Sequence, residues 1–182
     1  MIEYITNEIA YYRSNIDCNK IIEYFEIING FEEVNYRPHL TYWMNYKENE
    51  NDSQEVKYIR SVIKNDLFPV FHEYLTNQGV ESYCHRPRYL CSKMLPGKYM
   101  ESHQDPIKAY AYDVYLNDNF TGGQLIFDNL NLSITPEPGM LLMFRPYEMH
   151  HVTTLHDGPR YSYGSGITRT DKSDDYFGMM YN

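Results

Sequence analysis

No apolar stretch of the sequence approaches the roughly 20 residues that a transmembrane helix needs, so we expect no membrane span. A secretory signal is lacking too, because the segment MIEYITNEIAYYR carries acidic residues before its first arginine and has no small-residue cleavage site. Cysteine is sparse: Cys18, Cys84 and Cys91 form an odd set of three, which argues against a disulfide framework. These absences together predict a cytoplasmic protein.

Positive charge is scarce as well. The chain has 16 basic and 25 acidic residues, for a formal net charge of -9, which disfavours nonspecific binding to nucleic acid or to an anionic membrane. Tryptophan occurs once, but tyrosine occurs 20 times among 182 residues, and tyrosine suits half-buried strands and pocket walls. The length predicts a single domain, and the composition leaves its oligomeric state open.

Helical periodicity is confined to the first 80 residues, where it predicts three helices. The first covers residues 17–29, with Asp17 placed to cap its start and Gly30 to end it. The second begins at Ser53, and Pro69 is expected to break or restart it before a third helix ends at Gly79. Their apolar faces are typical of a helical layer that packs on a sheet. We therefore expect residues 1–80 to form a supporting layer.

After Gly79 the sequence changes to short segments that are rich in strand-forming residues and separated by turn sequences such as LPGK, PEPG and HDGP. No strand–helix alternation is present, which excludes a doubly wound α/β sheet. The even spacing predicts a sandwich, a jelly roll or a small barrel over residues 81–170, and residues 171–182 are expected to be a loose tail. The expected strands are 88–95, 109–116, 124–127, 132–135, 140–144, 150–155 and 161–168.

The segment Glu101-Ser102-His103-Gln104-Asp105 carries the first candidate for chemistry. His103 and Asp105 are two residues apart, so on a strand they point to the same side and can bind one metal ion. A third ligand is available 45 residues later at His150, at the start of a predicted strand. Two histidines and one carboxylate on a β scaffold form the facial triad of non-haem Fe(II) enzymes, which leaves coordination sites open for catalysis.

Arg160 adds a fixed positive charge ten residues after His150, following a turn that is expected to bring it beside the metal site. Its planar guanidinium matches a carboxylate. A metal with open positions and a cation deeper in the same barrel together suit a small dicarboxylic acid, which can chelate the metal at one end and meet Arg160 at the other.

The order of these motifs is also that of a known family. A glycine precedes the His-x-Asp pair, a Tyr-Leu-Asn strand end is followed by Gly-Gly and Phe, and a Pro-x-x-Gly turn precedes His-x-Val, Gly and Arg-Tyr. Over residues 88–168 the sequence thus resembles the 2-oxoglutarate/Fe(II)-dependent dioxygenase superfamily, in its prolyl 4-hydroxylase-like branch. The matching residues are Gly97, His103, Asp105, Tyr115, Leu116, Asn117, Gly122, Gly123, Phe127, Pro136, Gly139, His150, Val152, Gly158, Arg160 and Tyr161.

The resemblance implies a mainly β fold, a double-stranded β-helix (jelly roll) with N-terminal helices packed on one side. It implies that His103, Asp105 and His150 are the iron ligands, and that Arg160 binds the distal carboxylate of 2-oxoglutarate with help from the Tyr115 hydroxyl. Fe(II), 2-oxoglutarate and O₂ are the implied cofactor and co-substrates, with ascorbate as a further candidate. Because Asp105 is present, hydroxylation is favoured over halogenation, in which a small residue replaces this carboxylate.

The sequence departs from the family pattern in two places. Met94 and Met100 stand where tyrosines are common, which removes a hydroxyl sometimes used on the co-substrate and leaves more of that role to Tyr115. The tryptophan that often follows Arg-Tyr is absent, and the Gly164-Ser165-Gly166 segment takes its place. We therefore expect a smaller or more flexible pocket wall there.

Other candidate ligands carry less weight. His151 faces the opposite side of a strand from His150, and His156 lies in a turn. His39, His72 and His85 are expected at the surface or in satisfied structural positions, and Cys84, His85 and Cys91 lack a fourth zinc ligand. The basic segment Arg86-Pro87-Arg88 is expected near the mouth of the site, as a solvated loop in preference to a contact for an acidic substrate.

The function expected from the resemblance is hydroxylation of an unactivated C–H bond, first of all in a prolyl residue of a peptide or protein. A free amino acid or another small molecule is the alternative substrate. Two alternatives of other kinds remain: a jelly-roll module that holds a metal without turnover, and a cupin-like metalloenzyme that uses no 2-oxoglutarate. The presence of Arg160 together with all three ligands disfavours both, since neither explains a buried cation.

Overall fold

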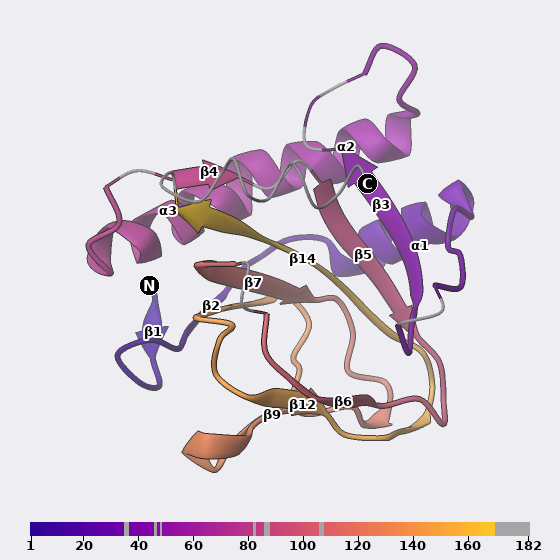
Figure 1. Ribbon diagram of the computed structural model, residues 1–182. Helices are drawn as coiled ribbons and strands as arrows, with labels where there is room; N and C mark the ends of the chain where they lie inside the picture. The colour runs from indigo at the N-terminus through magenta and orange to yellow at the C-terminus, as the bar shows by residue number, and fades with distance from the viewer. Residues whose placement is uncertain are drawn as a thin grey trace, which may run out of the picture.

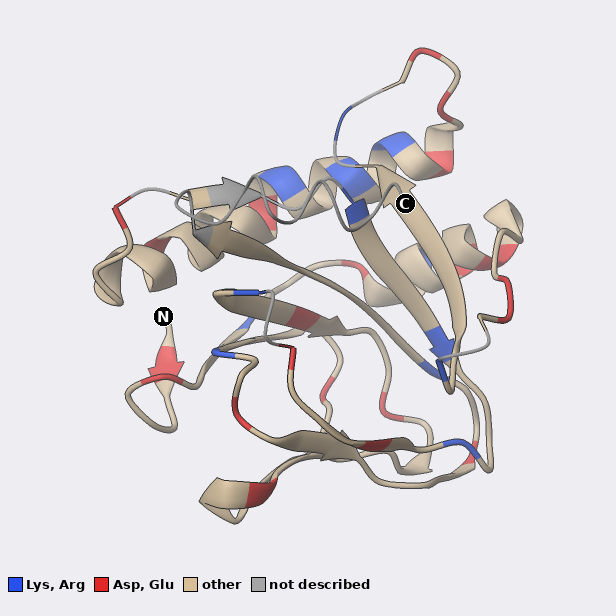
Figure 2. Cartoon of the chain, viewed as in Figure 1, with Lys and Arg blue, Asp and Glu red and all other residues tan. Residues whose placement is uncertain are grey.

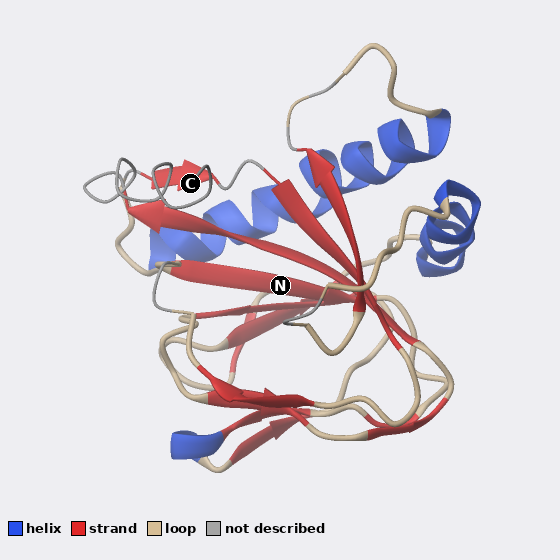
Figure 3. Ribbon diagram, turned by 45° about the vertical axis from the view of Figure 1, so that its right-hand side comes forward, coloured by secondary structure: helices blue, strands red, loops and turns tan. Residues whose placement is uncertain are grey.

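Two larger antiparallel sheets face each other, and helices cover the outer face of the larger sheet (Figure 1; Figure 3). This is the arrangement in the computed structural model, which describes residues 1–34, 37–45, 47, 49–81, 83–85, 88–105 and 108–169. The expected tail, 171–182, lies outside the described residues. The predicted jelly roll with helices on one side is confirmed.

Helix α1 (Cys18–Ile28) begins where the sequence predicts, because the Asp17 carboxylate accepts a hydrogen bond from a backbone N–H of the first turn. Phe25 on its apolar face is fully buried against the larger sheet. The helix ends at Asn29, whose φ of 45° is left-handed, so the stop comes one residue before the predicted Gly30.

The second and third helices are joined rather than separated. Helix α2 (Gln54–Val62) is capped by Ser53 as predicted and runs into the π-helical turn η1 (Ile63–Leu67), which leads directly into α3 (Phe68–Asn77). Pro69 lies in the first turn of α3, directly after the π-helical turn η1. The proline therefore falls where π-helical hydrogen bonding changes to α-helical, and the helical run continues past it.

The larger sheet has the strand order β1-β2-β11-β7-β14-β5-β3, and β4 pairs with β14. The first 80 residues contribute its two edges as well as the helices, which their periodicity did not indicate. Its strands are β1 (Glu3–Tyr4), β2 (Ala10–Arg13), β3 (Leu40–Asn45), β4 (Tyr83–His85), β5 (Arg88–Met94), β7 (Tyr110–Tyr115), β11 (Met140–Phe144) and β14 (Arg160–Arg169).

The smaller sheet has the order β10-β9-β12-β6, and a separate pair is formed by β13 and β8. The predicted strand 150–155 divides between two of these elements, and β6 was not among the predicted strands. The elements are β6 (Met100–His103), β8 (Thr121–Gly122), β9 (Leu125–Phe127), the short 3₁₀ helix η2 (Asp128–Leu130), β10 (Leu132–Ile134), β12 (His150–Val152) and β13 (Leu155–Asp157).

Strand β7 shows how the two cores are divided. Tyr112 and Val114 pack under the helices, whereas Ala111 and Tyr115 belong to the core between the sheets. Because side chains alternate along a strand, Asp113 also faces the space between the sheets. The inner face of the larger sheet therefore carries a carboxylate in the middle of its central region.

Charged side chains are distributed over the helices and loops. In the view of Figure 2, the described part of the chain presents no continuous basic face, in keeping with the excess of acidic residues. No helix in the described ranges is both long and apolar enough to cross a membrane.

The Gly122-Gly123 turn is a steric requirement of the fold. Both residues have left-handed backbones, with φ of 75° and 64°. A Cβ atom on Gly122 would also overlap the backbone oxygen of Thr154 on the neighbouring segment. Side chains are therefore excluded here by the turn and by the close approach of a second chain segment.

Gly122→Ala should lower the free energy of unfolding by at least about 3 kcal/mol, from the left-handed backbone together with the steric overlap. Gly79→Ala is the matched control, since Gly79 has a nearly equal φ of 74° but no atom near the added Cβ. It should cost only about 1 kcal/mol. Urea unfolding of both variants measures the difference, and equal losses would show that the overlap relaxes freely.

Candidate active site

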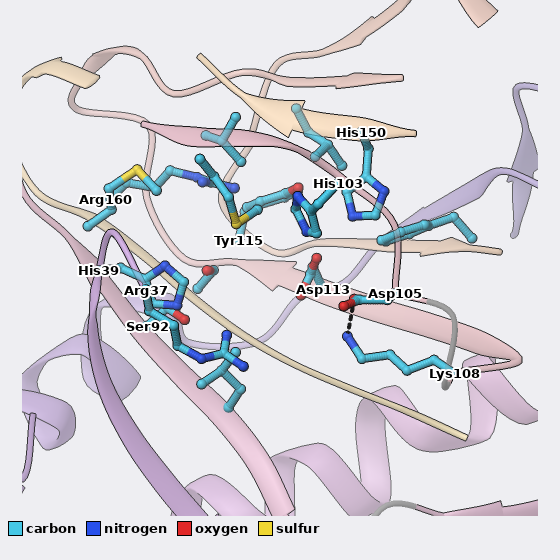
Figure 4. A pocket seen from close by; sticks show the side chains of 17 residues that line it. Arg37, His39, Ser92, His103, Asp105, Lys108, Asp113, Tyr115, His150 and Arg160 are labelled. Atoms are coloured by element: carbon cyan, nitrogen blue, oxygen red, sulfur yellow. Dashed lines mark hydrogen bonds and ion pairs between the residues drawn. The ribbon is translucent and has the colours of Figure 1, made fainter. Parts of the chain in front are cut away.

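Three potential metal ligands meet at the open side of the space between the sheets. His103 is the last residue of β6, and it is paired directly with His150, the first residue of β12. Asp105 follows in the loop, where its backbone N–H donates to the Pro146 carbonyl at 2.7 Å. One ligand atom from each of the three side chains lies within 4.8 Å of the others (Figure 4). The structure thus brings together the three predicted ligands.

The route to this geometry differs from the one that the sequence suggested. The prediction placed His103 and Asp105 on one strand, where alternation would align them. The strand ends at His103, and Asp105 is positioned instead by its hydrogen bond to the loop that precedes β12. The cross-strand pairing of the two histidines, which no spacing rule reveals, completes the cluster.

Both imidazoles are oriented by backbone carbonyls. His103 Nδ1 lies 2.8 Å from the Glu101 oxygen, and His150 Nδ1 lies 2.6 Å from the Glu148 oxygen. Because a carbonyl oxygen only accepts, each Nδ1 carries the proton and each Nε2 is left with a free lone pair. This is the arrangement in which outer hydrogen bonds fix metal-binding histidines.

The surroundings favour the ionisation states that bind a metal. His150 is buried against Phe127 and Phe144, with ring centroids 6.0 Å and 5.5 Å away, and this burial lowers its pKa and keeps it neutral. Burial acts to raise the pKa of Asp105. The ammonium group of Lys108, whose Nζ lies 2.6 Å from the Asp105 carboxylate, has the larger opposite effect, so the pKa of Asp105 is lowered. Two imidazole nitrogens and one carboxylate are donors that suit Fe(II).

A cavity of about 130 Å³ extends from the triad between the two sheets. At its inner end lie Arg160, the first residue of β14, and Tyr115, the last residue of β7. The Arg160 Cζ atom is 4.9 Å from the centroid of the Tyr115 ring. Both side chains are buried, and within the described part of the chain neither Arg160 Nε nor the Tyr115 hydroxyl has a hydrogen-bond partner. Buried donors without partners mark a place for an anionic ligand.

The predicted departures from the family pattern have visible consequences. Met94 and Met100 both line the cavity, and Tyr115 is the one tyrosine among its described lining residues. On the wall formed by the larger sheet, Gly164 leaves room for the Asp113 carboxylate, which a Cβ at that position would overlap. The space left by the missing aromatic residue is therefore occupied in part by an acidic side chain.

His39 and Asp113 are cavity residues that sequence reasoning missed. His39 was expected at the surface or in a satisfied structural position, but it is only 8 % exposed and its Nε2 has no partner among the described residues. Side chains alternate along a strand, so the inward-facing Tyr115 predicts that Asp113, two residues earlier on β7, also faces the cavity. The sequence carries no comparable signal for His39, because it precedes β3, a strand that the periodicity did not predict.

A wider groove of about 720 Å³ opens outward from the triad. One side is formed by residues 37–39, and the other by residues 97–101, which lead along β6 to His103. Within the described residues, β6 has β12 as its single neighbour, so its outer edge borders this groove. The site is therefore reachable by a molecule larger than the one that the inner cavity holds.

The alternative ligands lie elsewhere or outside the described structure. His151 points away from the triad, and its Nδ1 is 2.7 Å from the Asp128 carboxylate. Cys91 is buried under the helices, on the other face of the sheet, and the side chains of Cys84 and His85 lie outside the described residues. Residues 86–87 of the basic segment also lie outside the described residues, whereas Arg88 is described and is exposed.

The buried His39 should make stability depend on pH. Burial, with help from Arg37 and Arg160, lowers its pKa from the ordinary 6.5 to about 4. The unfolded chain binds this proton more readily, so stability is fully present above pH 6.5 and is lost as the pH falls toward 4, by up to about 3 kcal/mol.

Unfolding of the protein without metal or co-substrate should therefore show a steeper loss of stability between pH 6.5 and 4 than the His39→Gln variant does. His156→Gln, at an exposed position of β13, should keep the original slope. Equal slopes for all three proteins would contradict a buried, neutral His39.

Comparison with known proteins gives a consistent answer at the level of structure. No family model and no curated protein matches the sequence. A prolyl hydroxylase from Trichoplax adhaerens, solved with a hypoxia inducible factor peptide fragment, matches with a TM-score of 0.71 and 16 % identity, over 93 % of this chain and 87 % of that one.

Two further structures match at similar levels. The viral collagen prolyl hydroxylase of Paramecium Bursaria Chlorella virus-1, solved with 2-oxoglutarate, has a TM-score of 0.64 at 15 % identity and covers 90 % of this chain and 96 % of its own. A Pseudomonas putida prolyl-4-hydroxylase has a TM-score of 0.64 at 15 % identity, with coverage of 90 % and 94 %. The chain thus has the fold of the 2-oxoglutarate/Fe(II) oxygenases, in the form found in prolyl hydroxylases.

Proposed function

We propose that this protein is a 2-oxoglutarate- and Fe(II)-dependent oxygenase that hydroxylates an unactivated C–H bond. The observation that carries the proposal is one cavity with a two-histidine, one-carboxylate cluster at its open side. At its inner end lies the buried Arg160, whose Nε has no hydrogen-bond partner among the described residues. A metal alone would explain the first feature and an anion alone the second. A 2-oxo diacid that chelates the metal explains both.

His103, Asp105 and His150 would hold the iron, through the two Nε2 atoms and the carboxylate. Iron, 2-oxoglutarate and O₂ supply the oxidation, and the chain supplies position and electrostatics. Three protein ligands leave the other coordination positions for the co-substrate and O₂. Lys108 would share the Asp105 carboxylate with the metal and keep it ionised.

Arg160 and Tyr115 would bind the distal carboxylate of 2-oxoglutarate. Burial raises the pKa of Tyr115 above its ordinary value, so the phenol keeps its proton and can donate. Phe144 and Leu125 line the apolar part of the cavity, which suits the methylene groups of the diacid. A cavity of about 130 Å³ fits a small acid and excludes a larger one.

We propose a prolyl residue in a peptide or protein as the substrate. The outer groove of about 720 Å³ offers more room than a free amino acid fills, and it reaches the triad directly. The Trichoplax adhaerens enzyme of the same fold was solved with a peptide fragment. A free amino acid or another small molecule is the alternative substrate, and the identity of the hydroxylated atom is decided by experiment.

A metal-binding module without turnover is the competing function. Such a module needs no second charged group in its cavity, and a buried cation without an anion is costly. The retention of Arg160 and Tyr115 beside the triad therefore favours an enzyme that takes an organic acid.

Purified protein with Fe(II), 2-oxoglutarate, O₂ and ascorbate should form succinate, slowly without substrate and faster with a peptide that it hydroxylates. Asp105→Ala should abolish this turnover because it removes a metal ligand. Asp128→Ala, which removes a carboxylate on the outer side near His151, should leave turnover unchanged. Mass spectrometry of proline-containing peptides and free amino acids identifies the substrate by a gain of one oxygen. Undiminished turnover in Asp105→Ala would contradict the ligand assignment.

Arg160→Met should weaken 2-oxoglutarate binding by roughly two orders of magnitude, since it removes the charged partner of a buried carboxylate. Metal binding should be retained, because Arg160 is not part of the triad. Titration of the Mn(II)-loaded protein with 2-oxoglutarate measures the first effect, and the EPR signal of free Mn(II) measures the second. A variant that binds 2-oxoglutarate normally would show that the diacid lies elsewhere.

A further inference from the structure

We propose that His39 is a third binding residue for the carboxylate that Arg160 and Tyr115 hold, with its Nε2–H as the donor. The inference rests on the proposed function and extends it to a residue outside the motifs that the family resemblance supplies. It assigns to His39 the recognition of a distal carboxylate, and so the choice of a 2-oxo diacid over a 2-oxo monoacid.

The strand registers place His39 in line with Arg160. Leu40, the first residue of β3, pairs with Lys93, and on the other side of β5 Arg160 pairs with Met94. One step beyond the Leu40 pair, His39 therefore lies beside Met94, in the same row as Arg160. Thr41 pairs with Ser92, which lines the cavity, so alternation directs His39 to that face too.

The His39 side chain is directed into the cavity. It lines the inner cavity and the outer groove, and Figure 4 shows it with Arg160 on the side of the pocket away from Lys108. The residue is only 8 % exposed, yet its Nε2 atom has no hydrogen-bond partner in the described part of the chain. Native structures seldom leave such an atom unsatisfied, so a bound group is expected to meet it.

Three unpartnered buried groups converge on this one cavity: His39 Nε2, Arg160 Nε and the Tyr115 hydroxyl, within the ranges that the structure describes. All three can donate a hydrogen bond, and a carboxylate accepts several. The set thus complements a carboxylate better than it complements a neutral or cationic group.

The imidazole contributes as a neutral donor. Burial, together with Arg37 and Arg160, holds the pKa of His39 at about 4, so the ring carries no charge near neutral pH. Arg160 already balances one carboxylate charge, and a neutral donor adds directionality without a further cation to desolvate. The titratable groups facing this end of the cavity are Arg37, Arg160, Tyr115 and, on the β7 wall, Asp113.

A purely structural role does not account for His39. Its backbone is held independently, since the Thr41 hydroxyl donates to the His39 carbonyl at 3.4 Å and β3 pairs along its length with β5. It is not part of the described metal cluster either. Substitution of the ring should therefore leave the strand and the triad in place.

The test compares binding of 2-oxoglutarate and pyruvate to Mn(II)-loaded protein under nitrogen, where no turnover occurs. Pyruvate has the same 2-oxo acid end but no distal carboxylate. Trp43, the single tryptophan of the chain, stacks near Arg37 with the guanidinium 5.3 Å from its ring and reports binding through fluorescence. Mn(II) affinity is measured in parallel by EPR.

His39→Leu should weaken 2-oxoglutarate binding about tenfold and leave pyruvate and Mn(II) binding unchanged. His39→Gln, whose amide nitrogen reaches the position of Nε2, should bind 2-oxoglutarate within about threefold of the original protein. His39→Asn, whose amide reaches only as far as Nδ1, should lose as much as the leucine variant. His156→Leu, at an exposed position, is the control and should change nothing.

The outcomes separate the two proposals. If the original protein binds Mn(II) but not 2-oxoglutarate, the proposed function is wrong and the inference falls with it. If the original protein binds and His39→Leu or His39→Asn binds equally well, the inference alone is overturned. Equal losses for 2-oxoglutarate and pyruvate also overturn it, because they indicate a general change of pocket shape. Should the leucine variant fail to fold, the asparagine and glutamine pair still decides the question.

Discussion

A buried guanidinium at the inner end of the cavity is the constraint on which this structure depends. Arg160 is almost fully enclosed between the sheets, and removing such a charge from water without compensation is costly. The fold keeps it there because β14 lies in the middle of the larger sheet, between β7 and β5, so its first residue cannot reach solvent without leaving the sheet. The burial of this charge therefore favours an acidic ligand at the inner end of the cavity, which is the basis of the proposed function.

The second requirement is that the candidate metal ligands meet at one end of the edge pair of the smaller sheet, β6 and β12. The direct pairing of His103 with His150 sets the imidazoles side by side, with ring centroids 4.4 Å apart, and the two carbonyl contacts fix which nitrogen faces inward. Asp105 is then brought in by a loop. Phe127 of the smaller sheet packs against Phe144 of the larger sheet, with ring centroids 5.3 Å apart, and His150 packs against both, so the candidate ligands are held by the core between the sheets.

The sequence allowed much of this to be predicted, and the misses share a physical cause. Local signals were sufficient for the Asp17 and Ser53 caps and for most strands of the β core. Strands β2 and β3 were missed because each is stabilised by pairing with a strand more than 40 residues away, as when Leu40 pairs with Lys93. His39 was missed for the same reason, since its position follows from that pairing alone. Motif spacing predicted His103, Asp105, His150 and Arg160 as site residues, and the structure places all four around one cavity.

The charges that line the inner cavity suit the joint binding of a metal and a diacid that the proposed function requires. Three cations, Arg37, Lys108 and Arg160, face two aspartates, Asp105 and Asp113, so the formal balance is 3 − 2 = +1 with neutral histidines. A divalent metal alone would raise this to about +3 in a poorly hydrated space, and a dianion alone would lower it to about −1. Bound as a pair they leave the balance unchanged. Burial raises the pKa of Asp113, whereas Lys108 and Arg160 oppose that rise. Under the proposed function, the metal and the diacid therefore each bind more favourably in this cavity when the other is present, and this coupling follows from electrostatics alone.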